Sequence, residues 1–284
     1  MAVAARLTAG GRDLRALAVL LLPSAALIAF LFILPVALVL ALSFTDPDVG
    51  LDNYRLLVEN PALGRIFLTT LRITVVTVLV ATFVGYLVAY RMLHAGPREF
   101  RFILFCLLIP LWTPILVRAF AWVALLQNNG IINGILMDLG LLDGPVRMVR
   151  NELGVLIGMI HVMIPYATLP IYSAMKGLDP RVMQAARSLG ARPWSTFWRV
   201  FFPMTLPGVG TAMILVFVIS IGFYVTPIVL GGGTVVMIAE YISVQITETV
   251  RWGLGSMLAT VLLAVVLLFV AAFRRLTILR QGVS

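Results

Sequence analysis

Side chains that could act as nucleophiles, general bases or metal ligands are few and scattered in this sequence. The two histidines, His94 and His161, are far apart, and neither belongs to a ligand pattern such as HExxH. The single cysteine, Cys106, lies inside an apolar run, which excludes a disulfide framework and a cysteine zinc site within the chain. No nucleophile is paired with a base, and no two carboxylates are paired. We therefore expect no catalytic residue, no metal site and no enzymatic activity in this chain.

One glycine run could be taken for a phosphate-binding loop. Gly231-Gly232-Gly233 is followed by Thr234 and Val235, without the lysine that such a loop places on the phosphates. We interpret the run as a tight turn at the end of an apolar segment. The chain alone should hydrolyse no ATP.

The stretch 176–207 is basic and too polar for a membrane interior, so it must lie on a water-facing side. Asp179 is a good N-cap and Pro180 suits the first helical position, which predicts a short helix that stops at Gly190. Pro193 should start a second short helix that ends before Pro203. The expected product is a compact pair of helices joined by a glycine turn.

The first of these helices has a small face at Ala185 and Ala186, which would let another protein approach its backbone closely. The pattern Gln184-Ala185-Ala186, then Gly190, then Val200-Phe201-Phe202-Pro203 resembles the EAA motif of permease subunits of binding-protein-dependent ABC importers. In that family the first helix of the motif docks on a cytoplasmic ATPase. The resemblance implies that docking uses Gln184, Ala185, Ala186, Arg187, Gly190, Ala191 and Pro203. Two residues depart from the family motif: Gln184 stands where the family has Glu, and Phe202 where it has Leu. The alternative interpretation of this stretch is an ordinary helical hairpin on a soluble face.

The composition requires a membrane around the rest of the chain. Of 284 residues, 61% are hydrophobic and 12% are charged. The net charge of +9 comes from basic residues at the ends of apolar runs, so we expect no nucleic-acid partner. Runs long enough to cross about 30 Å of hydrocarbon as a helix occur six times, at 14–44, 66–92, 102–126, 153–175, 208–230 and 254–273. This predicts an all-α, multi-pass membrane protein made of one transmembrane domain, 1–284.

Basic residues set the orientation. They concentrate before the first run, between the second and third, in 176–207 and after the last, whereas most acidic residues fall on the other side. Both termini and the 176–207 loop are therefore predicted to be cytoplasmic. On the outer side we expect an interfacial or re-entrant segment at 130–142 and an amphipathic helix at 235–250 that carries Glu240. That helix could be a gate, a landing surface for a binding protein, or a passive lid.

Polar and aromatic groups within the predicted spans are candidates for a substrate pathway. Arg118 lies in the predicted third span, where burying its charge in hydrocarbon costs free energy. Its guanidinium should therefore face a cavity, pair with another polar group, or extend to the membrane surface. Prolines interrupt the third, fourth and fifth spans, and broken helices are tolerated where the backbone lines a cavity. We take Trp112, Arg118, Tyr166, Tyr224 and Glu240 as the pathway candidates, with ordinary helix packing as the alternative for each.

The resemblance extends over the whole chain and points to the methionine-importer-type permease fold. Within it, Leu169-Pro170-Ile171-Tyr172-Ser173-Ala174 and Tyr224-Val225-Thr226-Pro227 are similar to the spermidine/putrescine permease group, which also imports opines and other amines. This implies a bacterial inner-membrane location and several partners: a second permease subunit, an ATPase dimer that binds ATP and Mg²⁺, and an extracytoplasmic solute-binding protein. No cofactor is implied on this chain.

A stand-alone secondary transporter is the other functional class. It would usually need ionisable residues in mid-span to couple solute to an ion gradient, and the sequence offers little beyond His161 and Arg118.

Overall fold

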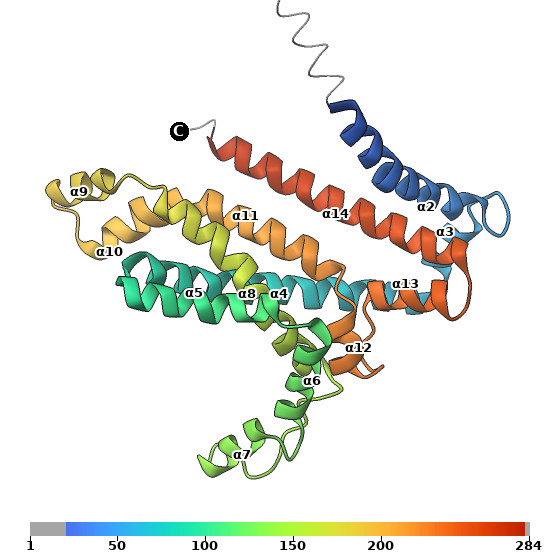
Figure 1. Ribbon diagram of the computed structural model, residues 1–284, viewed down its shortest axis with the longest axis horizontal. Coiled ribbons are helices and arrows are strands. Elements are labelled where there is room, and N and C mark those ends of the chain that lie inside the picture. The colour runs from blue at the N-terminus through green and yellow to red at the C-terminus, as the bar shows by residue number, and fades with distance from the viewer. Residues whose placement is uncertain (1–20, 282–284) are drawn as a thin grey trace, which may run out of the picture.

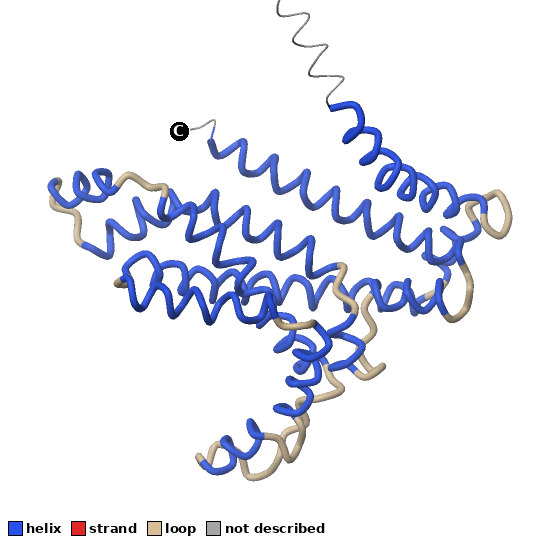
Figure 2. Tube along the Cα trace, viewed as in Figure 1, coloured by secondary structure: helices blue, strands red, loops and turns tan. Residues whose placement is uncertain are grey.

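The computed structural model describes residues 21–281, and every regular element within that range is a helix (Figures 1 and 2). The elements are η1 (Ala29–Ile33), α2 (Leu34–Thr45), α3 (Asp52–Glu59), α4 (Pro61–His94), α5 (Pro97–Trp112), α6 (Ile115–Leu126), α7 (Ile131–Asp138), α8 (Glu152–Lys176), α9 (Pro180–Ser188), α10 (Pro193–Thr196), η2 (Phe197–Phe201), α11 (Phe202–Ile221), α12 (Val225–Gly231), α13 (Ile238–Thr247) and α14 (Trp252–Gln281). The predicted all-α class is confirmed.

Six helices between residues 21 and 281 are long and apolar enough to cross a membrane, as predicted. They cover Leu21–Thr45, Pro61–His94, Ile115–Asp138, Glu152–Lys176, Pro193–Ile221 and Trp252–Phe273. The predicted start of the first span, 14–20, lies outside the described residues.

Helix α8 forms the centre of the bundle and packs mainly on α4 and α11. Close approach is possible because small residues face one another: a Cβ on Gly85 of α4 would lie 2.8 Å from the Cβ of Ala167, and a Cβ on Gly208 of α11 would collide with Ala174. Small residues at helix crossings are the usual way to bring membrane helices together. Met163 and Ile171 of α8 are fully buried at this centre.

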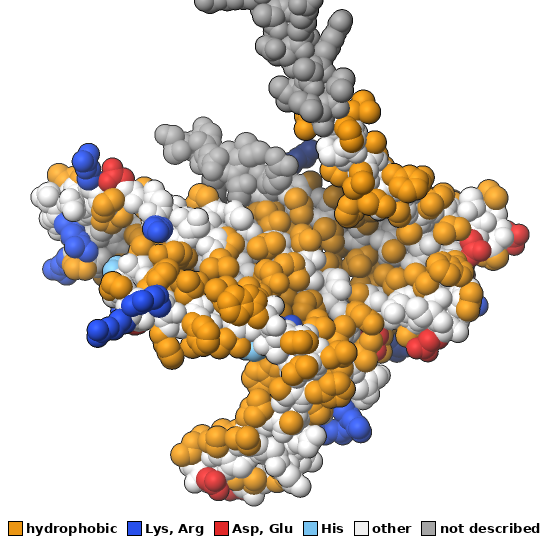
Figure 3. Space-filling model, viewed as in Figure 1, with side chains coloured by type: hydrophobic (Ala, Val, Ile, Leu, Met, Phe, Trp, Pro, Cys, Tyr) orange, Lys and Arg blue, Asp and Glu red, His pale blue; other side chains and the backbone are white. Residues whose placement is uncertain are grey.

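Two helices on one side of the bundle face outward. α2 packs on α14 and runs beside it (Figure 1). Apolar side chains cover the visible surface of α2 and most of the long helices (Figure 3). An apolar surface of this extent is expected to contact lipid and not water.

The third predicted span, 102–126, is not one helix. It breaks at Thr113 and Pro114 into α5 and α6, and the candidate span in this region is instead Ile115–Asp138. Proline lacks the N–H that would continue the helix, and it disfavours helical conformation in the residue before it. Thr113 is accordingly extended, with φ −80° and ψ 130°.

The predicted helix end before Pro203 is also wrong, because α10, η2 and α11 form one continuous helix over Pro193–Ile221. The π-helical turn Phe197–Phe201 immediately precedes Pro203, which lies in the first turn of α11. A wide π turn relieves the local hydrogen-bond register that the proline ring would otherwise disrupt. The predicted fifth span, 208–230, likewise ends early at Ile221, and the separate helix α12 follows the break at 222–224.

Candidate functional site

The predicted first short helix, α9, begins and ends where its sequence indicates. The Asp179 carboxylate accepts a hydrogen bond from the Arg181 N–H at 2.9 Å, and Pro180 occupies the first turn. At the other end Gly190 has φ +84°. The Gly190 N–H donates to the Arg187 carbonyl at 2.9 Å, and the Ala191 N–H donates to the Ala186 carbonyl at 3.1 Å. This is the Schellman arrangement, and it satisfies carbonyls that the helix end would leave unbonded.

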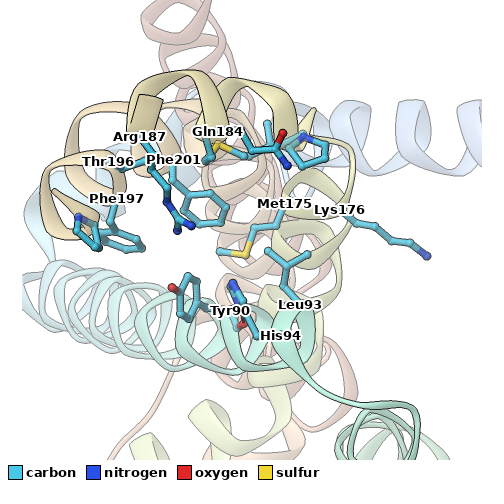
Figure 4. A pocket seen from close by; sticks show the side chains of 14 residues that line it. Tyr90, Leu93, His94, Met175, Lys176, Gln184, Arg187, Thr196, Phe197 and Phe201 are labelled. Carbon is cyan, nitrogen blue, oxygen red and sulfur yellow. Dashed lines mark hydrogen bonds between the residues drawn. The ribbon is translucent and has the colours of Figure 1, made fainter. Parts of the chain in front are cut away.

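The predicted docking residues of α9 lie on two different faces. Gln184 and Arg187 line a cavity between α9 and the bundle (Figure 4). Ala185 is exposed and is not among the residues that line this cavity, and Leu189 is 89% exposed at the helix end. The outer side therefore exposes the small Ala185 and the apolar Leu189, whereas Gln184 and Arg187 give the inner side polar groups.

Helix α9 is joined to the rest of the molecule by turns, while the helix that follows it is firmly packed. The Tyr90 ring of α4 meets Phe197 and Phe201 edge to face, with centroids 5.6 and 5.7 Å apart. One turn earlier, the Tyr86 hydroxyl lies 3.2 Å from the Thr205 hydroxyl. A force applied to α9 would thus act through the 177–179 and 189–192 turns on α8 and on the α10–α11 helix.

Sequence reasoning missed the residues of α4 that face α9. His94 was expected to be isolated, but it lies on the cavity wall with Tyr90. Tyr86, Tyr90 and His94 are spaced by four residues, which places them on one helical face. That spacing is the signal that could have grouped them.

Among the pathway candidates, Arg118 is fixed by the α5–α6 break. Its guanidinium donates a hydrogen bond to the carbonyl of Pro110. In an unbroken helix that carbonyl would accept from the residue at 114, but Pro114 has no N–H to give. Arg118 therefore replaces the missing helix hydrogen bond, which gives this charged residue a polar partner within a candidate span.

The break also brings α6 and α8 together. The Trp122 indole N–H donates to His161 Nδ1 at 3.3 Å. Arg118 interacts electrostatically with both His161 and Tyr166. Of the five predicted pathway residues, the structure gathers Arg118 and Tyr166.

The other three pathway candidates lie apart from this pair. Trp112 is largely exposed at the end of α5, and Tyr224 is exposed at the start of α12. Glu240 is only 8% exposed, on α13, which packs on α14.

Glu240 is buried, although it belongs to the helix predicted to be amphipathic. Burial raises the pKa of its carboxyl, and a hydrogen bond from the Met237 backbone partly offsets this effect. Its Oε2 atom has no hydrogen-bond partner within the described part of the chain. The carboxyl therefore faces the interior between helices and not open solvent.

No metal centre emerges from residues 21–281, because no three His, Cys, Asp or Glu side chains among them are grouped closely enough to hold an ion.

Comparison with known proteins decides the family. The model of the family "Binding-protein-dependent transport system inner membrane component" matches residues 81–281. The chain belongs to this family. It is therefore a multi-pass inner-membrane permease subunit, and the alternative of a stand-alone secondary transporter is set aside.

Curated relatives and solved structures agree with this membership. The spermidine/putrescine transport system permease protein PotB of Haemophilus influenzae is 31% identical over 84% of this permease and 87% of its own length. The inner membrane ABC transporter permease protein YdcU of Escherichia coli is 28% identical over 65% of this chain and 63% of its own. A chain of a bacterial ABC transporter that imports the acidic polysaccharide alginate has a TM-score of 0.76 at 20% identity, covering 96% of this chain and 99% of that chain. A second structure of an alginate ABC transporter, with its oligosaccharide-bound periplasmic protein, has a TM-score of 0.78 at 19% identity, covering 94% and 95%. These structural likenesses establish the fold.

Proposed function

We propose that this permease subunit belongs to an ABC importer that moves a polyamine, or a related small organic amine, into the cytoplasm. The observation that carries the coupling role is α9, a capped short helix at one end of the bundle that exposes Ala185 and Leu189 on its outer side (Figure 1). The substrate class rests on the resemblance to PotB, whose name assigns it to spermidine and putrescine transport.

In this proposal α9 is the contact with a separate ATPase dimer. ATP and Mg²⁺ bind to that dimer and not to this chain. Ala185 and Leu189 offer apolar side chains on the outer surface to an ATPase groove, whereas Gln184 lies on the cavity side of the helix. When the ATPases close, α9 moves with them, and the packed α10–α11 helix carries the displacement into the bundle.

The distribution of charge supports a cytoplasmic location for α9. Lys and Arg side chains gather at the end of the molecule that carries α9, whereas most visible Asp and Glu side chains lie at the opposite end and on the α7 arm (Figure 3). An excess of basic residues marks the cytoplasmic side of membrane proteins. The end with α3 and α13 would then face the solute-binding protein, and a second permease subunit would complete the pathway.

The described spans give little to bind a polyamine through charge. Acidic residues between 21 and 281 lie at or beyond the ends of the long helices. We infer that the binding protein selects the cation, and that this chain offers aromatic faces such as Tyr166 to a solute in transit.

The proposal is tested by uptake in a bacterial strain that lacks its own polyamine importers. The chain is expressed with its partner subunits, and accumulation of radiolabelled putrescine and spermidine is measured with and without an ionophore. We expect uptake that follows cellular ATP and survives collapse of the proton gradient. Uptake by this chain alone that stops with the ionophore would contradict the coupling role. A complex that assembles with its ATPases but transports neither amine would contradict the substrate class only.

A further inference from the structure

The cavity beneath α9 is lined by four elements, α4, α8, the α10–η2 helix and α9 itself. It has a volume of about 490 Å³. The end of α4 supplies Tyr90, Leu93 and His94, the end of α8 supplies Met175, and the α10–η2 helix supplies Phe197 (Figure 4). Helix α9 closes it from the remaining side with Met183, Gln184 and Arg187. Its walls are therefore largely apolar and aromatic, with a polar side formed by α9.

The charge of this cavity is of one sign. Its two charged residues are both basic: Arg187 points into the cavity and Lys176 extends outward from its rim (Figure 4). None of the lining residues is acidic. The ion pairs found between residues 21 and 281 use Arg55, Arg72 and Arg91, so the Arg187 guanidinium has no carboxylate partner there. Its five N–H donors are available to an anion, and they match the geometry of a phosphate.

The cavity also lies at the end of a helix long and apolar enough to cross a membrane. Tyr90 and His94 form the last turn of α4, one of the membrane-crossing helices. Beside the cavity, Trp194 is 74% exposed and its ring lies 5.6 Å from that of Trp198. Exposed tryptophans at the end of membrane helices typically sit at the membrane–water boundary. A molecule held here would have an apolar part against the rings of Tyr90 and Phe197 and an anionic part against Arg187.

We propose that this cavity binds a phosphate group carried on an amphiphilic molecule, with the anionic headgroup of a cytoplasmic-leaflet phospholipid as the source that its position favours. Basic pockets between membrane helices on the cytoplasmic side are suited to such headgroups. The cytoplasmic sidedness rests on the proposed function, but the binding site itself does not. A headgroup bound here would bridge α9 to α4, and so would set the position from which α9 moves.

The test is calorimetric titration of the detergent-purified full complex, with each lipid probe kept below its critical micelle concentration. The probes are dihexanoyl phosphatidylglycerol, dihexanoyl phosphatidylcholine and inorganic phosphate. We expect saturable binding of phosphatidylglycerol, weakened about tenfold by Arg187→Gln, since a guanidinium–phosphate contact is a strong charge-assisted hydrogen bond. Arg187→Lys should restore binding only in part, because it keeps the positive charge but loses the planar set of donors. Arg181→Gln is the matched control, because Arg181 lies on the same helix and does not line the cavity.

A second variant on another element guards against a local effect on α9. Leu93→Trp fills the cavity from α4, and it should reduce phosphatidylglycerol binding with Arg187 intact. Phosphate binding with the same Arg187 dependence, and no preference for phosphatidylglycerol, would support the site and assign it to a soluble phosphate compound. Binding that neither Arg187→Gln nor Leu93→Trp weakens, or that Arg181→Gln weakens equally, would overturn the proposal. None of these readouts depends on transport, so failure of the polyamine assignment leaves them unaffected.

Discussion

Replacement of Gly190 tests whether the end of α9 depends on a left-handed residue. A Cβ at this position would meet no atom within 4 Å, so a substitution causes no clash within the chain. The cost is conformational: at φ +84° an L-residue loses about 1–2 kcal/mol relative to glycine. The smaller freedom of alanine in the unfolded chain returns about 0.4–1 kcal/mol. The net loss for Gly190→Ala is therefore roughly 1 kcal/mol.

Hydrogen exchange followed by mass spectrometry measures this loss locally. The Ala191 amide is protected by its bond to the Ala186 carbonyl, and a loss of roughly 1 kcal/mol should speed its exchange about fivefold. Gly190→Asn should have a smaller effect because asparagine tolerates the left-handed region, and Gly190→Val a larger one because it is β-branched.

Gly134→Ala supplies a control of opposite sign. Gly134 lies inside α7, and a Cβ there would also meet no atom within 4 Å. Alanine should stabilise that helix by about 0.5–1 kcal/mol and slow its exchange. Equal exchange at 191 in Gly190→Ala and wild type would refute the left-handed cap.

The same position also tests function. Gly190→Val should leave the spans inserted, and it should weaken ATPase retention or uncouple ATP hydrolysis from uptake. Full ATPase retention and full coupling would remove the mechanical basis of the docking assignment.

Three further predictions follow from single residues. Arg118→Gln should lower the thermal unfolding midpoint, because a hydrogen bond from a charged donor contributes about 1.5–3 kcal/mol. The loss of stability should be smaller in a Pro114→Ala background, because the restored N–H at 114 can reach the Pro110 carbonyl. Losses of stability that simply add in the double variant would contradict this reasoning. Since burial raises the pKa of Glu240, the folded state holds that proton more tightly than the unfolded chain, and stability should fall as the pH rises from the ordinary value through the raised pKa. Glu240→Gln should flatten the dependence of stability on pH in unfolding scans, and an unchanged dependence would show that another group titrates. In a separate uptake assay, a reduced rate for Glu240→Gln would indicate that the Glu240 carboxylate receives the solute or the binding protein. Ser188→Cys in a Cys106→Ser background should react with membrane-impermeant maleimide in inverted vesicles and not in intact spheroplasts, and labelling of spheroplasts would reverse the orientation.

The sequence by itself determined the features whose causes are local. Asp179, Pro180 and Gly190 fix the ends of α9 through hydrogen bonds and backbone angles that span only a few residues. The number of candidate spans follows equally directly from the length of the apolar runs, because water cannot solvate them. The motif around Gln184 was readable for the same reason, since its residues are close in the chain.

Only the tertiary structure decided what the interruptions do. Pro114 breaks a span, but its use is visible only when Arg118 is seen on the Pro110 carbonyl. Pro203 does not end a helix, because the π turn before it absorbs the strain. Propensity alone could not reveal either outcome, since each depends on how neighbouring turns compensate for a missing N–H.

Burial and shared cavities also depend on segments far apart in the chain. Glu240 reads as a polar residue on an amphipathic helix, yet the packing of α13 on α14 buries it. The cavity under α9 joins Tyr90 to Arg187, and nothing in their sequence separation indicates that they share a wall. Local patterns give a residue its secondary structure, whereas its exposure is set by the helices that fold against it, and these are chosen by the close packing of small residues such as Gly85.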